Sequence, residues 1–416
     1  MGMTVGQAVP PAAGSILGKE STVVTRRQML AAAGSASAWL ALEPAFAQTP
    51  GKQLRNMGGA PAGFPAHSRG GRPPGGAPPG AGAGRGPDGA ALGAGRGPGG
   101  AAAGAGRGPG GGGGRGPSFD FLTYFHSLGF GVAEGARPAS NDPEAIKAFR
   151  DKVEQLHMRV ILDAGFPRNE AGVEAFEAGV KMAKEAGAIC VHAAMTNRRY
   201  EEFNDFASFK TSFENNQKSI ALAEPILRKY RMRMSIENHK GWRSAEQAAW
   251  LKRLGSEWVG VHFDFGNNVS LCEDPNDTLK NLLPYTFACH IKDMAVQPYD
   301  DGFLLSEVPL GEGFLDLKGM VATLQKKDPN MAFDLEMITR EPLKIPVFTS
   351  KYWVTFDDAY SPLPARDLAH ILDIVHKNPP KTPPPATAGL AADEFLKLED
   401  LCVSKSIDWA RQNLNL

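Results

Sequence analysis

From residue 118 onward, short apolar runs alternate with longer segments in which apolar residues recur every three or four positions. The short runs have the length of buried strands, and the longer segments have the period of amphipathic helices. Repeated strand–helix units predict a parallel sheet covered by helices. The predicted strands are 129–134, 158–163, 188–192, 232–237, 258–264, 287–290 and 331–336, and the predicted helices are 118–128, 142–157, 170–186, 209–230, 243–254, 275–283, 315–326 and 364–377.

The span 118–378 has about the ~250 residues typical of a (β/α)8 TIM barrel, but it supplies one strand too few. Upstream, residues 53–60 are the only candidate for the missing first strand. If 48–65 holds that strand and its loop, the following segment is an insertion in the first strand–helix connection. The alternative is a plain linker that leads into a barrel with a different beginning.

Four polar residues stand at the ends of predicted strands: Glu237, Asp264, His290 and Glu336. The first two intervals between them match a strand–helix unit of roughly 30 residues, and the third fits such a unit with a long loop at 293–313. Because TIM-barrel chemistry lies at the C-terminal ends of the strands, the four side chains are expected to converge there. Three carboxylates and an imidazole suit Mn²⁺, Mg²⁺, Co²⁺, Fe²⁺ or Zn²⁺ without selecting one.

The N-terminal residues 1–47 have the pattern of a twin-arginine signal peptide. Arg26 and Arg27 precede an Ala-rich apolar segment, and small residues around Ala45–Ala47 suit cleavage before Gln48. This predicts a periplasmic or extracellular protein without a stable membrane anchor after cleavage, since the apolar run is short for the roughly 20 residues of a membrane span. The alternative is a buried N-terminal helix or a membrane anchor.

Residues 66–117 are dominated by Gly, Ala, Pro and Arg, and Gly-Ala-Gly-Arg-Gly-Pro recurs at 82, 93 and 104. Almost no apolar side chain is present to offset the entropy of ordering the backbone, so this segment is predicted to be disordered. Its arginines lack interleaved aromatic residues for base stacking. Basic and acidic residues balance at 45 each over the chain, so no nucleic-acid partner is predicted.

The C-terminal residues 379–416 comprise a Pro-rich connection and an amphipathic helix near 391–413. This helix could pack on the barrel or pair with a second subunit in a homo-oligomer. The loop 340–358 is long enough to be a lid. No disulfide pairing can be deduced from the spacing of the four cysteines, Cys190, Cys272, Cys289 and Cys402.

Five short motifs together resemble the xylose-isomerase-like TIM-barrel superfamily, which includes sugar phosphate isomerases and epimerases and the type 2 apurinic endonucleases. They are Ile236–His239, Phe263–Asn267, His290–Asp293, Gly311–Gly313 and Leu335–Glu336. The resemblance implies that Glu237, Asp264, His290 and Glu336 bind one divalent cation, with Mn²⁺ favoured. It also implies that Glu237 and Glu336 act as general base and acid, in an order left open, around a metal-stabilised enediolate.

Two positions depart from that family's pattern. Asn267 stands where a histidine is usual, and Val296 stands where the ketose 3-epimerases have an arginine. The further histidines needed for the trinuclear zinc cluster of the apurinic endonucleases are missing from 294–313. The departures weaken a ketose 3-epimerase assignment and argue against DNA repair.

Further polar and aromatic residues near the strand ends are candidates for binding substrate. Lys292 could hold a substrate carboxylate or pair with a strand-end acid, and Trp242 could stack on a sugar. His262 is one step deeper, where a core histidine is the better interpretation. The full set of substrate-binding candidates is Asp163, His192, His239, Trp242, Asn267 and Lys292.

These observations predict an exported, metal-dependent sugar isomerase or epimerase that abstracts a proton next to a carbonyl. The same site could instead run an inosose-type dehydration or decarboxylate a keto-sugar acid, because all three reactions pass through an enediolate. The substrate would be a sugar or a sugar acid. A non-catalytic secreted carbohydrate-binding barrel remains the alternative from another class.

Overall fold

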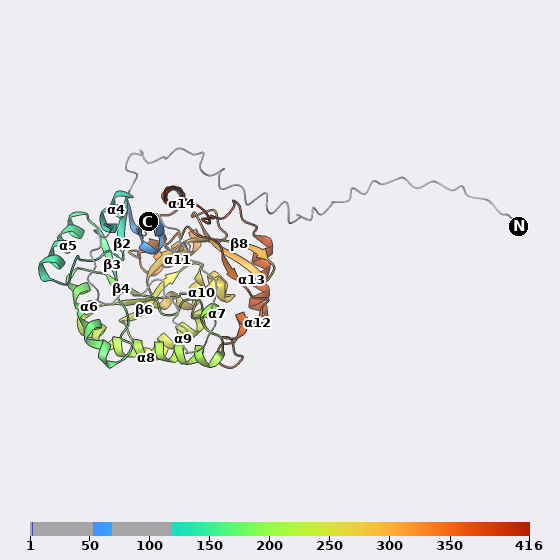
Figure 1. Cartoon of the computed structure of the whole chain (residues 1–416), viewed down its shortest axis with the longest axis horizontal. Helices are drawn as coiled ribbons and strands as arrows, with labels where there is room; N and C mark the ends of the chain where they lie inside the picture. The colour runs from blue at the N-terminus through green and yellow to red at the C-terminus, as the bar shows by residue number, and fades with distance from the viewer. Residues whose placement is uncertain (1, 3–52, 69–118) are drawn as a thin grey trace, which may run out of the picture. The chain divides into compact units, whose positions relative to one another are not determined.

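Eight parallel strands close into a barrel in the order β1-β10-β7-β6-β5-β4-β3-β2, which confirms the predicted TIM barrel. The computed structural model describes residues 2, 53–68 and 119–416. In Figure 1 the strands lie at the centre and the helices surround them. The barrel strands are β1 (Leu54–Gly59), β2 (Phe130–Glu134), β3 (Arg159–Asp163), β4 (Cys190–Ala193), β5 (Met234–Glu237), β6 (Val259–Asp264), β7 (Thr286–Ile291) and β10 (Phe333–Leu335).

Helices follow the barrel strands and turn apolar side chains towards them. In α8, for example, Phe213, Ile220 and Leu227 are buried at near-helical spacing. The helices are α3 (Pro65–Ser68), α4 (Phe121–Ser127), α5 (Pro143–Gln155), α6 (Val173–Glu185), α7 (Arg199–Glu202), α8 (Phe206–Tyr230), α9 (Ser244–Leu254), α10 (Pro275–Leu282), α11 (Leu317–Lys327), α12 (Ser350–Trp353), α13 (Ala365–Lys377) and α14 (Ala392–Asn413), with 3-10 turns at Pro61–Gly63, Glu170–Gly172, Asn267–Leu271 and Leu283–Tyr285.

The predicted first strand upstream of the low-complexity segment is confirmed. β1 pairs in parallel with both β10 and β2 and thereby closes the barrel. Gly58 belongs there for a steric reason, since a Cβ at this position would collide with the side chains of Asp334 and Val132. Residues 69–118 therefore fall in the first strand–helix connection of the sequence.

Together, the predicted signal peptide and low-complexity segment overlap the described residues only in part. The predicted signal peptide and residues 69–117 of the low-complexity segment lie outside the described residues. The first residues of that segment, 66–68, belong instead to α3, where Ala66 is buried.

The segment predicted as a long loop at 293–313 is largely a β-hairpin. β8 (Asp293–Tyr299) and β9 (Gly302–Val308) pair antiparallel, and β11 (Leu343–Ile345) adds a third strand outside the barrel. Gly302 makes the turn possible because its φ of 153° is rare for other residues. The hairpin arises from Met294, Val296, Phe303 and Leu305, whose buried side chains cover one face of this small sheet.

The predicted lid at 340–358 is a packed structure with β11 and α12 within it. Tyr352 is fully buried, and its hydroxyl donates to the carbonyl of Ser270 at 2.9 Å. Buried Arg199 holds the end of the segment by donating to Thr355 O at 2.5 Å and to Ser361 Oγ at 2.8 Å. These contacts anchor the segment 340–358 to the barrel, so it is not a free loop.

The C-terminal helix α14 packs on the barrel. Phe395, Val403 and Ile407 on one side of it are buried in the main core. Glu399, also buried, accepts hydrogen bonds from the backbone N–H of Ala66 at 2.6 Å and contacts the His67 ring at 2.7 Å. Glu399 therefore connects the end of the chain to α3, directly after the first strand.

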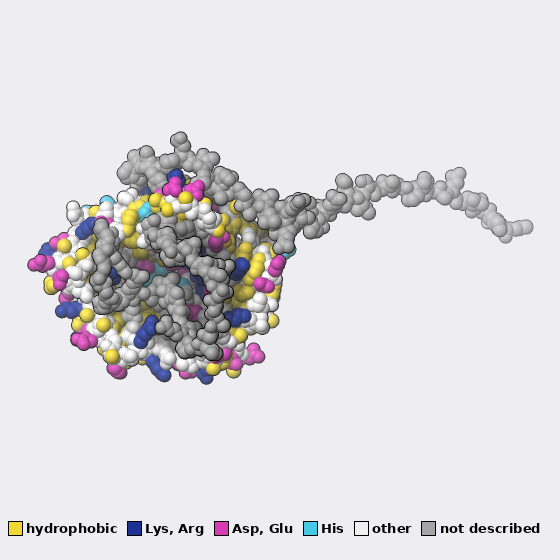
Figure 2. All heavy atoms as spheres, viewed as in Figure 1, with side chains coloured by type: hydrophobic (Ala, Val, Ile, Leu, Met, Phe, Trp, Pro, Cys, Tyr) yellow, Lys and Arg dark blue, Asp and Glu magenta, His cyan; other side chains and the backbone are white. Residues whose placement is uncertain are grey.

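The surface charges, the cysteines and the helix lengths of the described residues indicate no additional functional site. Basic and acidic side chains of the described residues are interspersed on the face seen in Figure 2. All four cysteines are buried free thiols. None of the helices within 53–68 and 119–416 is long and apolar enough to cross a membrane.

Arg199 offers a test of how the segment 340–358 is held. Replacing Arg199 with Met should lower the free energy of unfolding by about 3–5 kcal/mol, because Glu246 would lose its buried partner at 3.1 Å. Chemical denaturation measures the change. Arg198→Met is the matched control, since Arg198 pairs with the half-exposed Glu201, and it should change stability by less than about 0.5 kcal/mol. Equal effects of the two substitutions would contradict this role for Arg199.

Candidate metal centre

The four strand-end residues predicted to converge do converge. Each of Glu237, Asp264, His290 and Glu336 offers one potential ligand atom, and these atoms all lie within 4.8 Å of one another. All four side chains are buried at the C-terminal end of the barrel. Parallel pairing brings them together, since Asp264 on β6 is in register with His290 on β7. We call these four residues the rim cluster.

Glu134, at the end of β2, sets the orientation of the His290 ring. Its carboxylate lies 2.9 and 3.1 Å from His290 Nε2. An ionised carboxylate only accepts hydrogen bonds, so Nε2 carries a hydrogen, and in the neutral ring Nδ1 keeps the lone pair that a metal ligand needs. A carboxylate behind a histidine is the usual way in which proteins orient a metal-binding imidazole. The sequence analysis did not single out Glu134, although its place at a strand end was a usable signal.

The rim cluster fits a divalent cation. His290 Nδ1 has no hydrogen-bond partner and faces oxygens of Glu237, Asp264 and Glu336 at 3.7, 4.0 and 3.7 Å. Asp264 Oδ2 is also buried, and Lys292 Nζ lies 2.6 Å from it. Burial would lower the pKa of His290, but Glu134, Glu336 and Glu237 outweigh burial and raise it, and a divalent ion bound at Nδ1 would replace the second ring proton. One nitrogen and three carboxylate ligands are a set that first-row divalent ions accept.

The loop after β6 holds two carboxylates in place. Asp264 Oδ1 accepts hydrogen bonds from the backbone N–H of Gly266 and Asn267 at 2.9 and 2.7 Å. The Asn267 side chain donates to Glu237 Oε1 at 2.7 Å and accepts from Lys240 Nζ. Asn267, predicted as a substrate-binding residue, thus positions two members of the rim cluster.

Lys292 forms ion pairs within the rim cluster. Its ammonium group contacts Asp264 Oδ2 at 2.6 Å and donates to Glu336 Oε2. Burial would raise the pKa of Glu336, but Lys292 and His290 outweigh burial and lower it to about 2. For Asp264 burial prevails over Lys292 and raises the pKa to about 6. Of the two predictions for Lys292, the structure shows the pairing with strand-end acids.

His192 and Asp163 connect Glu237 to the exposed side of the barrel end. His192 Nε2 lies 3.6 Å from Glu237 Oε2, and His192 Nδ1 lies 3.0 Å from Asp163 Oδ1. The Asp163 side chain is 59 % exposed. Burial opposes protonation of His192, but Glu134, Asp163 and Glu237 together raise its pKa above the ordinary value. His192 thus lies between Glu237 and exposed Asp163, and its Nε2 has no hydrogen-bond partner among the described residues.

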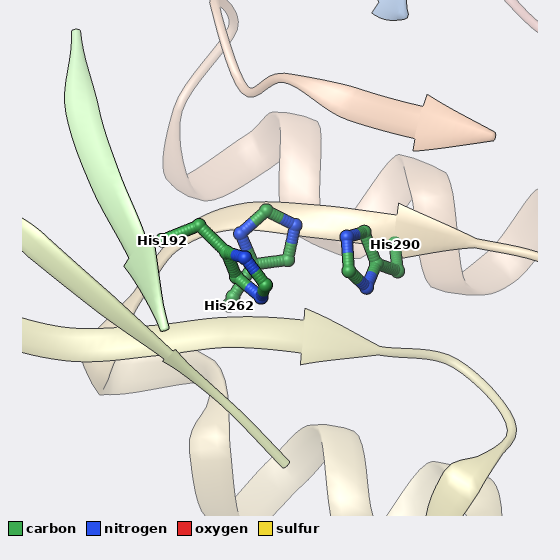
Figure 3. A group of neighbouring side chains, drawn as sticks. All are labelled: His192, His262 and His290. Carbon is green, nitrogen blue, oxygen red and sulfur yellow. The ribbon is translucent and has the colours of Figure 1, made fainter. Parts of the chain in front are cut away.

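The histidines of the barrel interior lie close together. Figure 3 shows the rings of His192, His262 and His290 side by side, and their centroids are 4.1 to 5.2 Å apart. His262 is fully buried, as expected for a core histidine. His239 Nδ1 donates a hydrogen bond to Thr196 O at 2.9 Å, because a carbonyl only accepts.

Trp242 lies in the packing behind β5. It is 5 % exposed, and its ring contacts Phe213 and Trp250 with centroid separations of 4.6 and 5.8 Å. This placement does not support the prediction that Trp242 stacks on a sugar. The error arose because its position in the loop after Glu237 was taken to mean exposure, whereas the aromatic side chains of α8 and α9 enclose it.

The family model of the xylose isomerase-like TIM barrel matches residues 122–352. The chain belongs to this family. The match includes β2 to β10 and thus the whole rim cluster.

Individual relatives are more distant. The uncharacterized protein YihM of Escherichia coli is 25% identical over 44% of this chain and 52% of that protein. The putative L-ribulose-5-phosphate 3-epimerase SgbU of the same organism is 30% identical over 25% of this chain and 37% of that protein. The chain therefore matches about half or less of the length of these relatives.

Among solved structures, a D-psicose 3-epimerase determined in the presence of D-fructose is 14% identical. The alignment covers 71% of this chain and 93% of that chain, with a TM-score of 0.43. A likeness of this size carries no argument about substrate.

Glu134 can be tested as a positioning residue for His290. Glu134→Gln should weaken divalent-metal binding about 10–100-fold, because the amide is a poorer acceptor for the His290 N–H. Titration of the metal-free protein with Mn²⁺ by calorimetry measures the effect. Asp163→Asn is the control, since Asp163 contacts none of the rim cluster, and it should change affinity less than about threefold. Unchanged affinity in Glu134→Gln would show that the contact does not orient a ligand.

Proposed function

We propose that this protein is a divalent-metal-dependent sugar isomerase or epimerase that moves a proton next to a carbonyl group. The observation that carries the proposal is the convergence of Glu237 and Glu336 with Asp264 and His290 at the active end of the barrel. Membership of the xylose isomerase-like family supports the same class of reaction. Export by the twin-arginine signal is part of the proposal, and it rests on the sequence of residues 1–47 alone.

Glu237, Asp264, His290 and Glu336 would hold the ion, and Asn267 would keep Glu237 and Asp264 in position. When bound, a divalent ion neutralises the negative charge that develops on substrate oxygens after a C–H proton leaves.

Glu237 is the better candidate for the base that exchanges protons with solvent. His192 lies next to its Oε2 and leads to exposed Asp163. Burial would raise the pKa of Glu237, but His239, His192 and His290 outweigh burial and hold it well below the ordinary value. The carboxylate is therefore ionised and able to accept a proton. Glu336 Oε2 accepts a hydrogen bond from Lys292. Because the pKa of Glu336 is lowered to about 2, any proton it receives is readily released.

Solvent deuterium exchange tests the proposal. The mature, metal-loaded protein should exchange one carbon-bound hydrogen of its substrate in D₂O, measured by NMR on a panel of ketoses, inososes and keto-sugar acids. Glu237→Gln and Glu336→Gln should each reduce the rate by orders of magnitude, because each removes a proton-transfer group. Glu312→Gln is the control, since Glu312 pairs with Lys405 and Thr382 away from the rim cluster.

Absence of exchange on every compound, with metal bound, would contradict an enzyme of this class. Retained ligand affinity in that case would favour the non-catalytic carbohydrate-binding barrel.

A second candidate, a dehydratase or decarboxylase acting on a keto-sugar acid, is favoured by the cations near the rim cluster. Lys240 is buried, and among the described residues its ammonium group donates only to Asn267 Oδ1. Burial, Lys292 and Arg340 lower the pKa of Lys240 to about 8, with opposing effects of Glu307 and Asp264. Its two remaining N–H donors and its charge suit a substrate carboxylate.

Lys240→Gln separates the two candidates. If the substrate is acidic, the variant should raise KM for keto-sugar acids at least about tenfold, because a charged hydrogen bond is lost, and should change KM for neutral ketoses less than about threefold. The exchange assay above, run at several substrate concentrations, gives both values. Equal effects on acidic and neutral compounds would exclude a carboxylate at Lys240.

A further inference from the structure

A second group of potential metal ligands lies inside the barrel beneath the rim cluster. Glu134, His262 and Asp334 each offer one ligand atom, and these atoms lie within 4.8 Å of one another. His262 and Asp334 stand two residues before Asp264 and Glu336 on the same strands, so they face the same interior one layer deeper. The exposed fractions of the three residues are 3%, 0% and 0%. We call them the interior cluster.

When Asp334 is ionised, the atoms that face one another in the interior cluster are all acceptors. Burial and Glu134 raise the pKa of Asp334, so a bound cation would displace its proton. Both carboxylate oxygens of Asp334 are buried without a hydrogen-bond partner. Ser235 Oγ donates to Val191 O at 3.2 Å, so it accepts from His262 Nδ1 at 3.3 Å. His262 Nε2 therefore keeps its lone pair. That atom has no hydrogen-bond partner and lies 3.5 Å from Glu134 Oε2.

A cation bound to this group would hold Asp334 in its ionised, acceptor-only form. A water molecule has two hydrogens, which are too few for two Asp334 oxygens, a Glu134 oxygen and His262 Nε2. Leaving these atoms unpaired in the barrel interior carries a large desolvation cost. Gly58 on the neighbouring strand leaves space for the Asp334 carboxylate, since a Cβ there would collide with Asp334 Oδ1. The chemistry of the cluster is that of a cation site.

We propose that Glu134, His262 and Asp334 bind a second divalent transition-metal ion, separate from the ion of the rim cluster. One imidazole nitrogen and two carboxylates suit a borderline ion such as Zn²⁺. The ion would join β2, β6 and β10 across the barrel interior. It would also fix Glu134, whose carboxylate orients His290, and so couple the interior cluster to the rim cluster.

Anomalous diffraction tests the proposal on the full mature chain. Crystals of the protein equilibrated with Zn²⁺ alone should give two anomalous peaks at the zinc edge. One peak should lie about 2.0–2.2 Å from His262 Nε2 and from oxygens of Glu134 and Asp334. The other should lie within the rim cluster. A peak at the rim with only water, or nothing, in the interior cluster would overturn the second site.

The diffraction experiment tests the rim cluster and the interior cluster independently. An interior peak without a rim peak would leave this inference standing and would remove the metal from the proposed function.

Metal content in solution provides matched variants. The wild type should bind two Zn²⁺ ions per chain, and Asp334→Asn and Asp264→Asn should each bind one, because each replaces one ligand of a different site. Mass spectrometry of the metal content, after circular dichroism has established folding, gives the count. Two ions in folded Asp334→Asn, or one in the wild type, would overturn the proposal. If Asp334→Asn does not fold, the wild-type diffraction map decides alone.

Discussion

The need to balance buried negative charge organises this barrel. Glu134, Glu237, Asp264, Asp334 and Glu336 all lie inside one end of it, where water cannot screen their repulsion. The protein supplies Lys292, hydrogen bonds from the loop after β6, and imidazoles that sit between the carboxylates. Atoms still unpaired after these contacts, His290 Nδ1 and both Asp334 oxygens, lie at the two proposed metal sites.

Closure of the barrel is what makes this arrangement possible. β1 joins β2 to β10, and in the closed barrel Glu134 on β2 faces His290 on β7 across the interior. β1 ends in two glycines, Gly58 and Gly59, where neighbouring side chains lie too close for a larger residue. Around the barrel end, the hairpin β8–β9 and the segment anchored by Arg199 form a second packed layer, so the cluster is held by secondary structure rather than by a mobile lid.

Sequence reasoning succeeded where a signal is local and failed where contacts between distant segments decide. The strand ends carrying Glu237, Asp264, His290 and Glu336 were recognisable because apolar runs stop at polar residues with a regular interval. Glu134 also ends a strand, yet its partner His290 is far along the chain, and nothing local connects the two. The hairpin at 293–308 was missed because its strands pair only with each other and with β11, outside the barrel repeat.

The sequence by itself determined the barrel, the direction of its strands and the convergence of the rim cluster, because strand periodicity and spacing dictate which side chains face inward at the same end. Only the tertiary structure decided which donors serve each carboxylate. It placed Lys292 between two acids, enclosed Trp242 among the helices and brought His262 and Asp334 together. Those outcomes depend on distances across the barrel interior, which no local pattern of residues encodes.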